Sequence, residues 1–311
     1  MPKRATPRSP RLRGGHGPVD RGQEQVIGVI GLGTMGSAMS SNLIKAGFQV
    51  QGYDIAPKAR AALRKAGGKP VSSIPGIKAN VVITSLPSAA ALQSVSASFS
   101  GKNRIVLETS TLPIEEKERA RATLAKKGIT LLDCPLSGTG AQARTGDLVV
   151  FASGERKAFE QAKPFLPGFS RAHYYLGAFG NGSRMKFVAN LLVAIHNVST
   201  AEAFVLGMKA GLAPQTIYEV MANSAGSSRM FQVRGPQMVA ARYRDATISV
   251  ALFQKDMKII GEFAAALGAP TPLFNASAAL YNAAMGLGHA HEDTASVCAV
   301  LERMGGVRRR R

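Results

Sequence analysis

The sequence of 311 residues contains no tryptophan and only two cysteines, Cys134 and Cys298. Two thiols cannot form a disulfide framework or a four-ligand zinc site, and such sparse cysteine is typical of a reducing compartment. Long apolar runs are also missing, because the richest stretch, 187–198, is interrupted by two asparagines and a histidine. A membrane span needs about 18 apolar residues. We therefore expect a soluble, cytoplasmic protein that does not enter a membrane.

Acidic residues are scarce as well, with 19 against 39 basic residues and a formal net charge of +20. Part of this charge lies in two tails, residues 1–25 and 306–311, and the rest is spread through the chain. A dispersed charge is typical of a solvated basic surface that also attracts anionic small molecules, so nucleic acid is the minority interpretation. The proline-rich first tail has almost no large apolar residues, which predicts disorder. It also lacks the apolar segment of a secretory signal, and its prolines oppose a transit-peptide helix.

Strand signals begin at Val26 and alternate with helical segments such as 56–67 and 114–127. The predicted strands are 26–30, 49–54, 80–86, 104–109, 129–136 and 147–154. This alternation predicts an α/β fold with a doubly wound parallel sheet of the Rossmann type over residues 26–178. After residue 178 the strand signal stops. One long connecting helix is expected over 181–210, within an all-helical second domain over 179–305.

A glycine-rich segment directly follows the first predicted strand and opens a helix. It reads Gly31-Leu32-Gly33-Thr34-Met35-Gly36, and Asp54 ends the next strand 23 residues after Gly31. Glycines here permit a tight turn and close approach to a pyrophosphate, which the helix N-terminus attracts. A carboxylate at position 54 binds ribose hydroxyls and repels a 2′-phosphate. We therefore predict NAD binding in preference to NADP, although the nearby Lys58 and Arg60 could weaken the discrimination.

Three further segments carry polar groups of the kind that bind or react. Asp133 to Gly140 follows a strand at the carboxyl edge of the sheet, where open α/β folds bind ligands. Gly180 to Lys186 opens the long helix, and Asn190 lies on the same face as Lys186 because four residues separate them. Phe253 to Met257 starts another helix.

With the glycine loop, these segments resemble the β-hydroxyacid dehydrogenase family, which includes 3-hydroxyisobutyrate dehydrogenase and tartronate semialdehyde reductase. The resemblance runs from about Val26 to Arg303. It implies a homodimer or homotetramer that acts on a small hydroxy acid with NAD. It also implies cofactor contacts at the glycine loop, Leu86, Pro87, Thr111 and Lys255, substrate binding by Ser137, Gly138, Thr139 and Lys255, and catalysis by Lys186 with Asn190.

The chemistry expected of Lys186 can be stated from physical principles. Oxidising an alcohol requires a base for the hydroxyl proton while hydride leaves the carbon. A lysine serves only if burial or nearby cations lower its pKa from about 10.4 towards neutrality. Asn190, one turn along, can bond the same hydroxyl. The non-catalytic alternative is a nucleotide-sensing or nucleic-acid-associated protein that uses the basic tails.

The substrate is predicted from later segments of the sequence. Residues 201–203, 225–231 and 253–256 look most like the L-threonate dehydrogenase branch, with 3-hydroxyisobutyrate dehydrogenase or tartronate semialdehyde reductase as alternatives. A four-carbon sugar acid presents several hydroxyls that need partners. Ser227, Ser228, Thr139 and Asn197 are the candidates, with a buried structural amide equally possible for Asn197.

The remaining polar candidates are interpreted structurally. Asp256 is expected to cap or pair within its own helix, and His196 to serve packing or the surface. Cys134 is expected to be a small core residue, although its place near Ser137 would allow sensitivity to alkylation. No metal is expected, because the acids near His289 and His291 lack a second ligand group.

Overall fold

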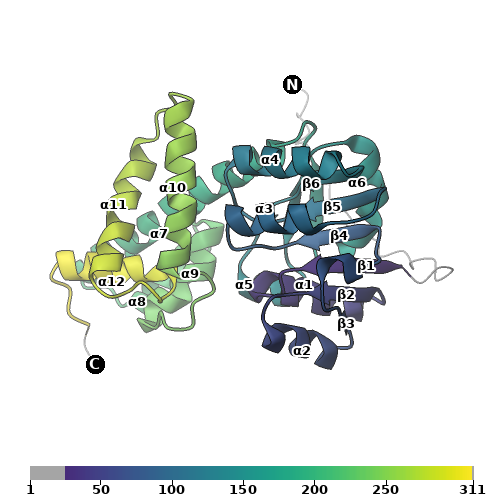
Figure 1. Cartoon of the computed structure of the whole chain (residues 1–311). Coiled ribbons are helices and arrows are strands. Elements are labelled where there is room, and N and C mark those ends of the chain that lie inside the picture. Colours follow the sequence, from purple (N-terminus) through teal and green to yellow (C-terminus); the bar gives the residue numbers. More distant parts are fainter. Residues whose placement is uncertain (1–24, 310–311) are drawn as a thin grey trace, which may run out of the picture.

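The computed structural model describes residues 25–309 and contains a sheet-bearing part followed by a helical part (Figure 1). The tail expected to be disordered, residues 1–25, lies outside the described residues except for Gln25. At the other end Arg309 is docked, because its guanidinium donates to Glu302 and to the carbonyl oxygens of Met238 and Val239.

The main sheet has six parallel strands in the order β3-β2-β1-β4-β5-β6. This is the strand order of a Rossmann fold, as expected from the sequence. The strands are β1 (Val26–Ile30), β2 (Gln49–Tyr53), β3 (Lys69–Pro70), β4 (Val81–Thr84), β5 (Arg104–Glu108) and β6 (Ile129–Asp133). The helices that connect them are α1 (Thr34–Lys45), α2 (Pro57–Lys65), α3 (Ala89–Ser98) and α4 (Ile114–Ala125), with a short 3-10 turn, η1 (Ile74–Gly76).

The strand predicted over 129–136 is in fact two strands in different sheets. β6 ends at Asp133, and after Cys134 and Pro135 the chain enters a three-stranded sheet. Pro135 has no N–H to continue the first ladder, and its carbonyl oxygen accepts from Phe151 instead. The second sheet comprises β7 (Leu136–Ser137), β8 (Val149–Ala152) and β9 (Ala172–Tyr175), with α5 (Gly140–Arg144), α6 (Arg156–Ala162) and η2 (Lys163–Gly168) between the strands.

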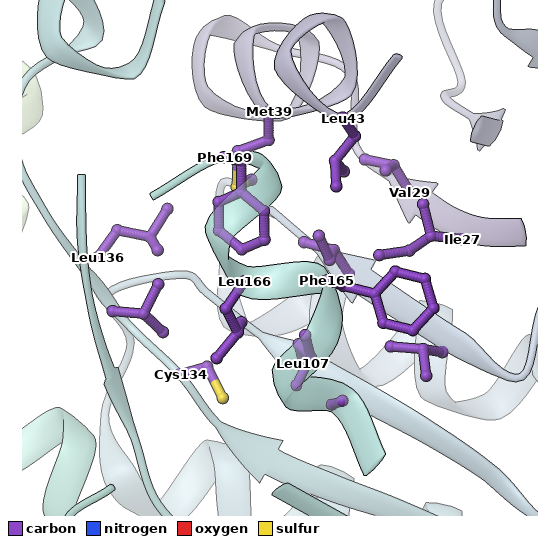
Figure 2. Packing of buried hydrophobic residues seen from close by; sticks show 14 of the residues in the cluster. Ile27, Val29, Met39, Leu43, Leu107, Cys134, Leu136, Phe165, Leu166 and Phe169 are labelled. Atoms are coloured by element: carbon purple, nitrogen blue, oxygen red, sulfur yellow. The ribbon is translucent and has the colours of Figure 1, made fainter. Parts of the chain in front are cut away.

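Side chains on alternate strand positions form two separate cores, one on each face of the main sheet. On one face Ile27 and Val29 pack with Met39 and Leu43 of α1 and with Phe165 and Phe169, which lie in η2 and directly after it (Figure 2). On the other, residues such as Val82 and Val106 pack under α3 and α4. Burial on both faces explains why the inner strands β1, β4 and β5 are nearly continuous apolar runs, whereas β2, nearer the edge, alternates.

The helical part is organised around α7 (Asn181–Lys209), which is about 43 Å long at 1.5 Å per residue. The helical part also contains α8 (Pro214–Met221), α9 (Arg229–Ala240), α10 (Val250–Ala266), α11 (Pro272–Gly286), η3 (Thr294–Ser296) and α12 (Val297–Met304). By length and composition α7 is long and apolar enough to cross a membrane, contrary to the expectation from the sequence. However, it packs against α9, α10, α11 and α12 and buries several polar side chains. In this fold it is the core helix of the helical part.

Candidate functional site

The segments predicted to bind the cofactor meet at one edge of the main sheet. The glycine loop follows β1, Asp54 follows β2, Leu86 and Pro87 follow β4, and Thr111 follows β5. Because all these strands are parallel, their carboxyl ends lie together, and β1 and β4 are hydrogen-bonded neighbours at the point where the strand order reverses. This is the position at which doubly wound sheets bind nucleotides.

The glycine loop has the geometry that a dinucleotide requires. Gly31 has a φ of +86°, and a Cβ there would lie 2.1 Å from the carbonyl oxygen of Ser85. A Cβ at Gly33 would meet nothing within 4 Å, so the loop faces open space at that point. Helix α1 begins at Thr34 without a side-chain cap or an acid in its first turn, which leaves its first N–H groups for an anion. Leu32 and Gly36 are buried, whereas Thr34 is exposed and Met35 half-buried.

Asp54, the residue predicted to bind a ribose, is hydrogen-bonded to the glycine loop. Its Oδ2 accepts from the Leu32 amide at 2.7 Å, and its Oδ1 accepts from Ala56 at 2.8 Å. The guanidinium of Arg60 donates to the carbonyl oxygens of Asp54 and Ile55. The carboxylate therefore also holds the loop in shape, and a cation lies beside it.

The loop expected to bind the substrate carboxylate connects β7 with α5. Ser137 and Thr139 are half-buried and Gly138 is exposed. The Thr139 hydroxyl caps α5 by accepting from the Gln142 amide, and the Gln142 side-chain oxygen accepts from the Thr139 amide. This capping box uses one lone pair of the Thr139 hydroxyl, so the prediction that it serves a substrate hydroxyl depends on the O–H that remains.

Lys186 and Asn190 are both buried on α7, with exposed fractions of 9% and 6%. Burial lowers the pKa of Lys186; the charge of Asp256 opposes this shift, and the charges of Lys255 and Lys117 add to it. The Asn190 Nδ2 donates to Asp256 Oδ2 at 2.9 Å. Because an ionised carboxylate only accepts, Asp256 fixes the orientation of the amide.

Lys255 connects the helical part to the cofactor edge. Its Nζ donates to the Thr111 carbonyl oxygen at 2.5 Å and lies 2.9 Å from Asp256 Oδ1. A second connection joins Arg229 of α9 to Asp147, with nitrogen and oxygen 3.9 Å apart. The structure thus joins Thr111, Lys255, Asp256 and Asn190 in one chain of contacts, and the charges of Asp256 and Lys255 act on Lys186.

The prediction for Asp256 covers only one of its two carboxylate oxygens. Asp256 was expected to cap or pair within its own helix, and it does contact the adjacent Lys255, but its other oxygen reaches α7. No local signal separates these outcomes, since the partner lies 66 residues away.

Three other candidates have structural roles. Asn197 is fully buried and donates to Tyr281 and Thr294, so it is the structural amide and does not meet a substrate. The Ser228 hydroxyl caps α9 by accepting from Phe231. Cys134 is buried, and burial raises the pKa of its thiol, which argues against the sensitivity to alkylation considered above.

Comparisons with known proteins agree with this geometry. Residues 26–177 match the NAD binding domain of 6-phosphogluconate dehydrogenase, and residues 180–301 match the NAD-binding region of NADP-dependent 3-hydroxyisobutyrate dehydrogenase. An L-threonate dehydrogenase of Cupriavidus necator is 32% identical over 88% of this chain and 95% of its own length. A 3-hydroxyisobutyrate dehydrogenase of Pseudomonas aeruginosa is 34% identical over 79% and 88%, respectively.

The fold has a counterpart among solved structures. A 3-hydroxyisobutyrate dehydrogenase from Salmonella typhimurium superposes with a TM-score of 0.80 and 28% identity, covering 88% of this chain and 99% of that one. Fold, site and relatives together define an NAD(P)-dependent oxidoreductase that acts on CH–OH groups. The chain belongs to the β-hydroxyacid dehydrogenase family and is a dehydrogenase of a small hydroxy acid. This membership decides against the non-catalytic alternative.

Proposed function

We propose that this enzyme oxidises the C2 hydroxyl of L-threonate, or of a related four-carbon sugar acid, with NAD as acceptor and Lys186 as general base. The observation that carries the catalytic part is the buried pair on α7, in which Lys186 has a lowered pKa and Asn190 is held by Asp256. The relatives named L-threonate dehydrogenase support the substrate.

The proposed mechanism divides the work among four groups. The backbone of Ser137 and Gly138 holds the substrate carboxylate, which places the carbinol carbon at the cofactor edge. Neutral Lys186 accepts the hydroxyl proton and becomes an ammonium ion. One N–H of the Asn190 amide is used by Asp256, and the other donates to the reacting oxygen. Bound NAD supplies the hydride acceptor. Most of the rate therefore comes from positioning and proton transfer.

Ser227 is the remaining partner for the extra hydroxyls of a sugar acid. Its Oγ is buried and has no hydrogen-bond partner among residues 25–309, whereas the hydroxyls of Thr139 and Ser228 accept helix-capping bonds and the Asn197 amide nitrogen donates within the helical core. Ser227 lies two residues before Arg229, which reaches Asp147 beside the substrate loop. A site with such an unpaired hydroxyl favours a substrate that can bond it.

The test is NADH formation with a panel of acids at equal concentration. We expect a higher kcat/KM for L-threonate than for 3-hydroxyisobutyrate or glycerate, and Ser227→Ala should lower it about tenfold for L-threonate only. A preference for 3-hydroxyisobutyrate, or for reduction of tartronate semialdehyde, would assign the chain to one of those alternative activities.

We further propose a cytoplasmic homodimer or homotetramer. Met185, Val188 and Leu192 form an exposed apolar stripe on α7, with exposed fractions of 42%, 55% and 46%. Their spacing places them on one face of the helix. An apolar stripe on a core helix of a soluble protein is typical of a surface covered by another subunit. The free thiols of Cys134 and Cys298 support a reducing compartment.

A further inference from the structure

A buried charge cluster lies near the site, and its one contribution to the chemistry described above is that the charge of Lys117 helps to lower the pKa of Lys186. Lys117 of α4 is fully buried, with its Nζ 2.7 Å from Glu108 Oε2 and 2.8 Å from Asp133 Oδ1. Glu108 and Asp133 end the neighbouring strands β5 and β6 and face each other in the register of the sheet. Burial alone would lower the pKa of Lys117, but Asp133 and Glu108 raise it above its ordinary value, so Lys117 stays protonated.

One arm of this cluster holds the start of the helix that carries Lys186. Asp133 Oδ2 accepts from the Ser183 amide at 2.7 Å, and Oδ1 accepts from the Ser183 hydroxyl at 2.8 Å. Ser153 accepts from the Gly182 amide and donates to Asp133. A carboxylate from β6 thus caps the first turn of α7, whose own residues supply no side-chain cap. Lys186 follows Ser183 by three residues.

The other arm holds the loops at the cofactor edge. Glu108 Oε1 accepts from the Ser110 amide at 3.0 Å, and the Ser110 hydroxyl accepts from the Leu86 amide at 2.8 Å. Thr111, the next residue, accepts from Lys255 through its carbonyl oxygen. Through Lys255 and Asp256 the chain of contacts reaches Asn190 and returns to α7.

We propose that Lys117, with Glu108 and Asp133, is a positioning cluster that sets the α7 N-terminus and the loops 85–87 and 109–111 in one fixed geometry. The inference rests on the proposed function, in which Lys186 is the proton acceptor. A buried ion cluster is weak evidence of stability, because well-packed apolar residues often do as well. Its two arms instead end at the two halves of the site, where a misplacement of about 1 Å can cost about 100-fold in rate.

The experiment separates the two arms with conservative variants. Ser183→Ala should lower kcat about tenfold while the KM of the hydroxy acid and the Kd of NAD stay within about twofold. Ser110→Ala should raise the Kd of NAD about tenfold and leave kcat at saturation within about twofold. Lys117→Met should do both. The Kd is measured by titration calorimetry on the whole protein, so the cofactor arm is read without turnover.

Two matched controls account for simple loss of a buried group. Ser277→Ala removes a buried hydroxyl bonded to Leu273 of α11, and Arg234→Met breaks the buried pair with Asp293. Both should leave kcat and the Kd of NAD within about twofold even where Tm falls. The proposal is overturned if Ser183→Ala and Ser110→Ala leave kcat and the Kd of NAD as unchanged as Ser277→Ala does. Ser183→Ala and Ser110→Ala test the proposal even if Lys117→Met does not fold. A wild type that oxidises no acid refutes the proposed function, whereas an unchanged Kd of NAD in Ser110→Ala refutes the cofactor arm.

Discussion

At the scale of single residues, Lys186 is the group on which the proposed chemistry depends. Lys186→Met keeps a similar length but removes the proton acceptor. We expect kcat to fall by about 100-fold or more, since a positioned acid or base contributes about that much. NAD affinity should stay nearly unchanged, because the side chain acts on the substrate hydroxyl. Steady-state kinetics and calorimetric titration measure the two quantities.

The control for this variant is Lys209→Met, which removes an exposed lysine at the far end of the same helix. It should retain wild-type kcat. Near wild-type kcat in Lys186→Met would show that this lysine is not the proton acceptor. A large loss of NAD affinity would show that it binds the cofactor instead.

We expect Asp54 to set the choice between the two nicotinamide cofactors. Its carboxylate bonds the Leu32 amide, so Asp54→Ala removes both a repulsive charge and a brace of the glycine loop. We expect a wild-type kcat/KM that favours NAD over NADP. In the variant the ratio should approach unity, with weaker use of NAD. Measuring kcat/KM for both cofactors tests this; equal use by the wild type would mean that Lys58 or Arg60 accommodates the 2′-phosphate.

At the scale of elements, the start of α7 is packed too closely for any side chain at Gly182. A Cβ there would lie 2.3 Å from the Phe151 carbonyl oxygen and 2.7 Å from that of Asp133. Gly182→Ala should therefore push the first turn away from β6 and β8. We expect a loss of about 1–3 kcal/mol in the free energy of unfolding, as for other overpacked sites, together with a reduced kcat.

A helical glycine with free space provides the comparison. Gly286, at the end of α11, would place a Cβ with nothing within 4 Å. Gly286→Ala should be neutral or slightly stabilising, because alanine has the better helix propensity. Denaturant unfolding of both variants measures the difference, and equal stability of Gly182→Ala and wild type would contradict the close packing.

At the scale of the whole molecule, the apolar stripe on α7 predicts self-association. Val188→Lys with Leu192→Lys would place two charges in the proposed interface, where burying them unpaired is costly. We expect light scattering to give a dimer or larger species for the wild type and a monomer for the double variant. Tyr174→Lys, which changes an exposed aromatic residue of β9, is the control and should keep the wild-type mass. A monomeric wild type would contradict the proposal.

Much of the fold and part of the site follow from the sequence because they depend on local rules. Apolar β-branched runs separated by helical segments predict a parallel sheet. The strand, the glycine turn, the helix and Asp54 together predict a nucleotide-binding site at the carboxyl edge of that sheet. The limits of α7 agree to within a residue of those expected. In each case the information lies within one element and its immediate neighbours.

The tertiary structure decided what depends on partners far apart in the chain. The chain changes direction after Pro135, which places β7 in a second sheet. Long-range contacts pair Asp256 with Asn190, and Lys117 with the carboxylates that end β5 and β6. Packing also determined that Asn197 is buried in the helical core and that the Thr139 hydroxyl caps a helix. A polar side chain in a sequence carries only its capacity to bond. Which partner satisfies it is settled by the burial that folding imposes, because an unpaired polar group in the interior costs too much free energy to persist.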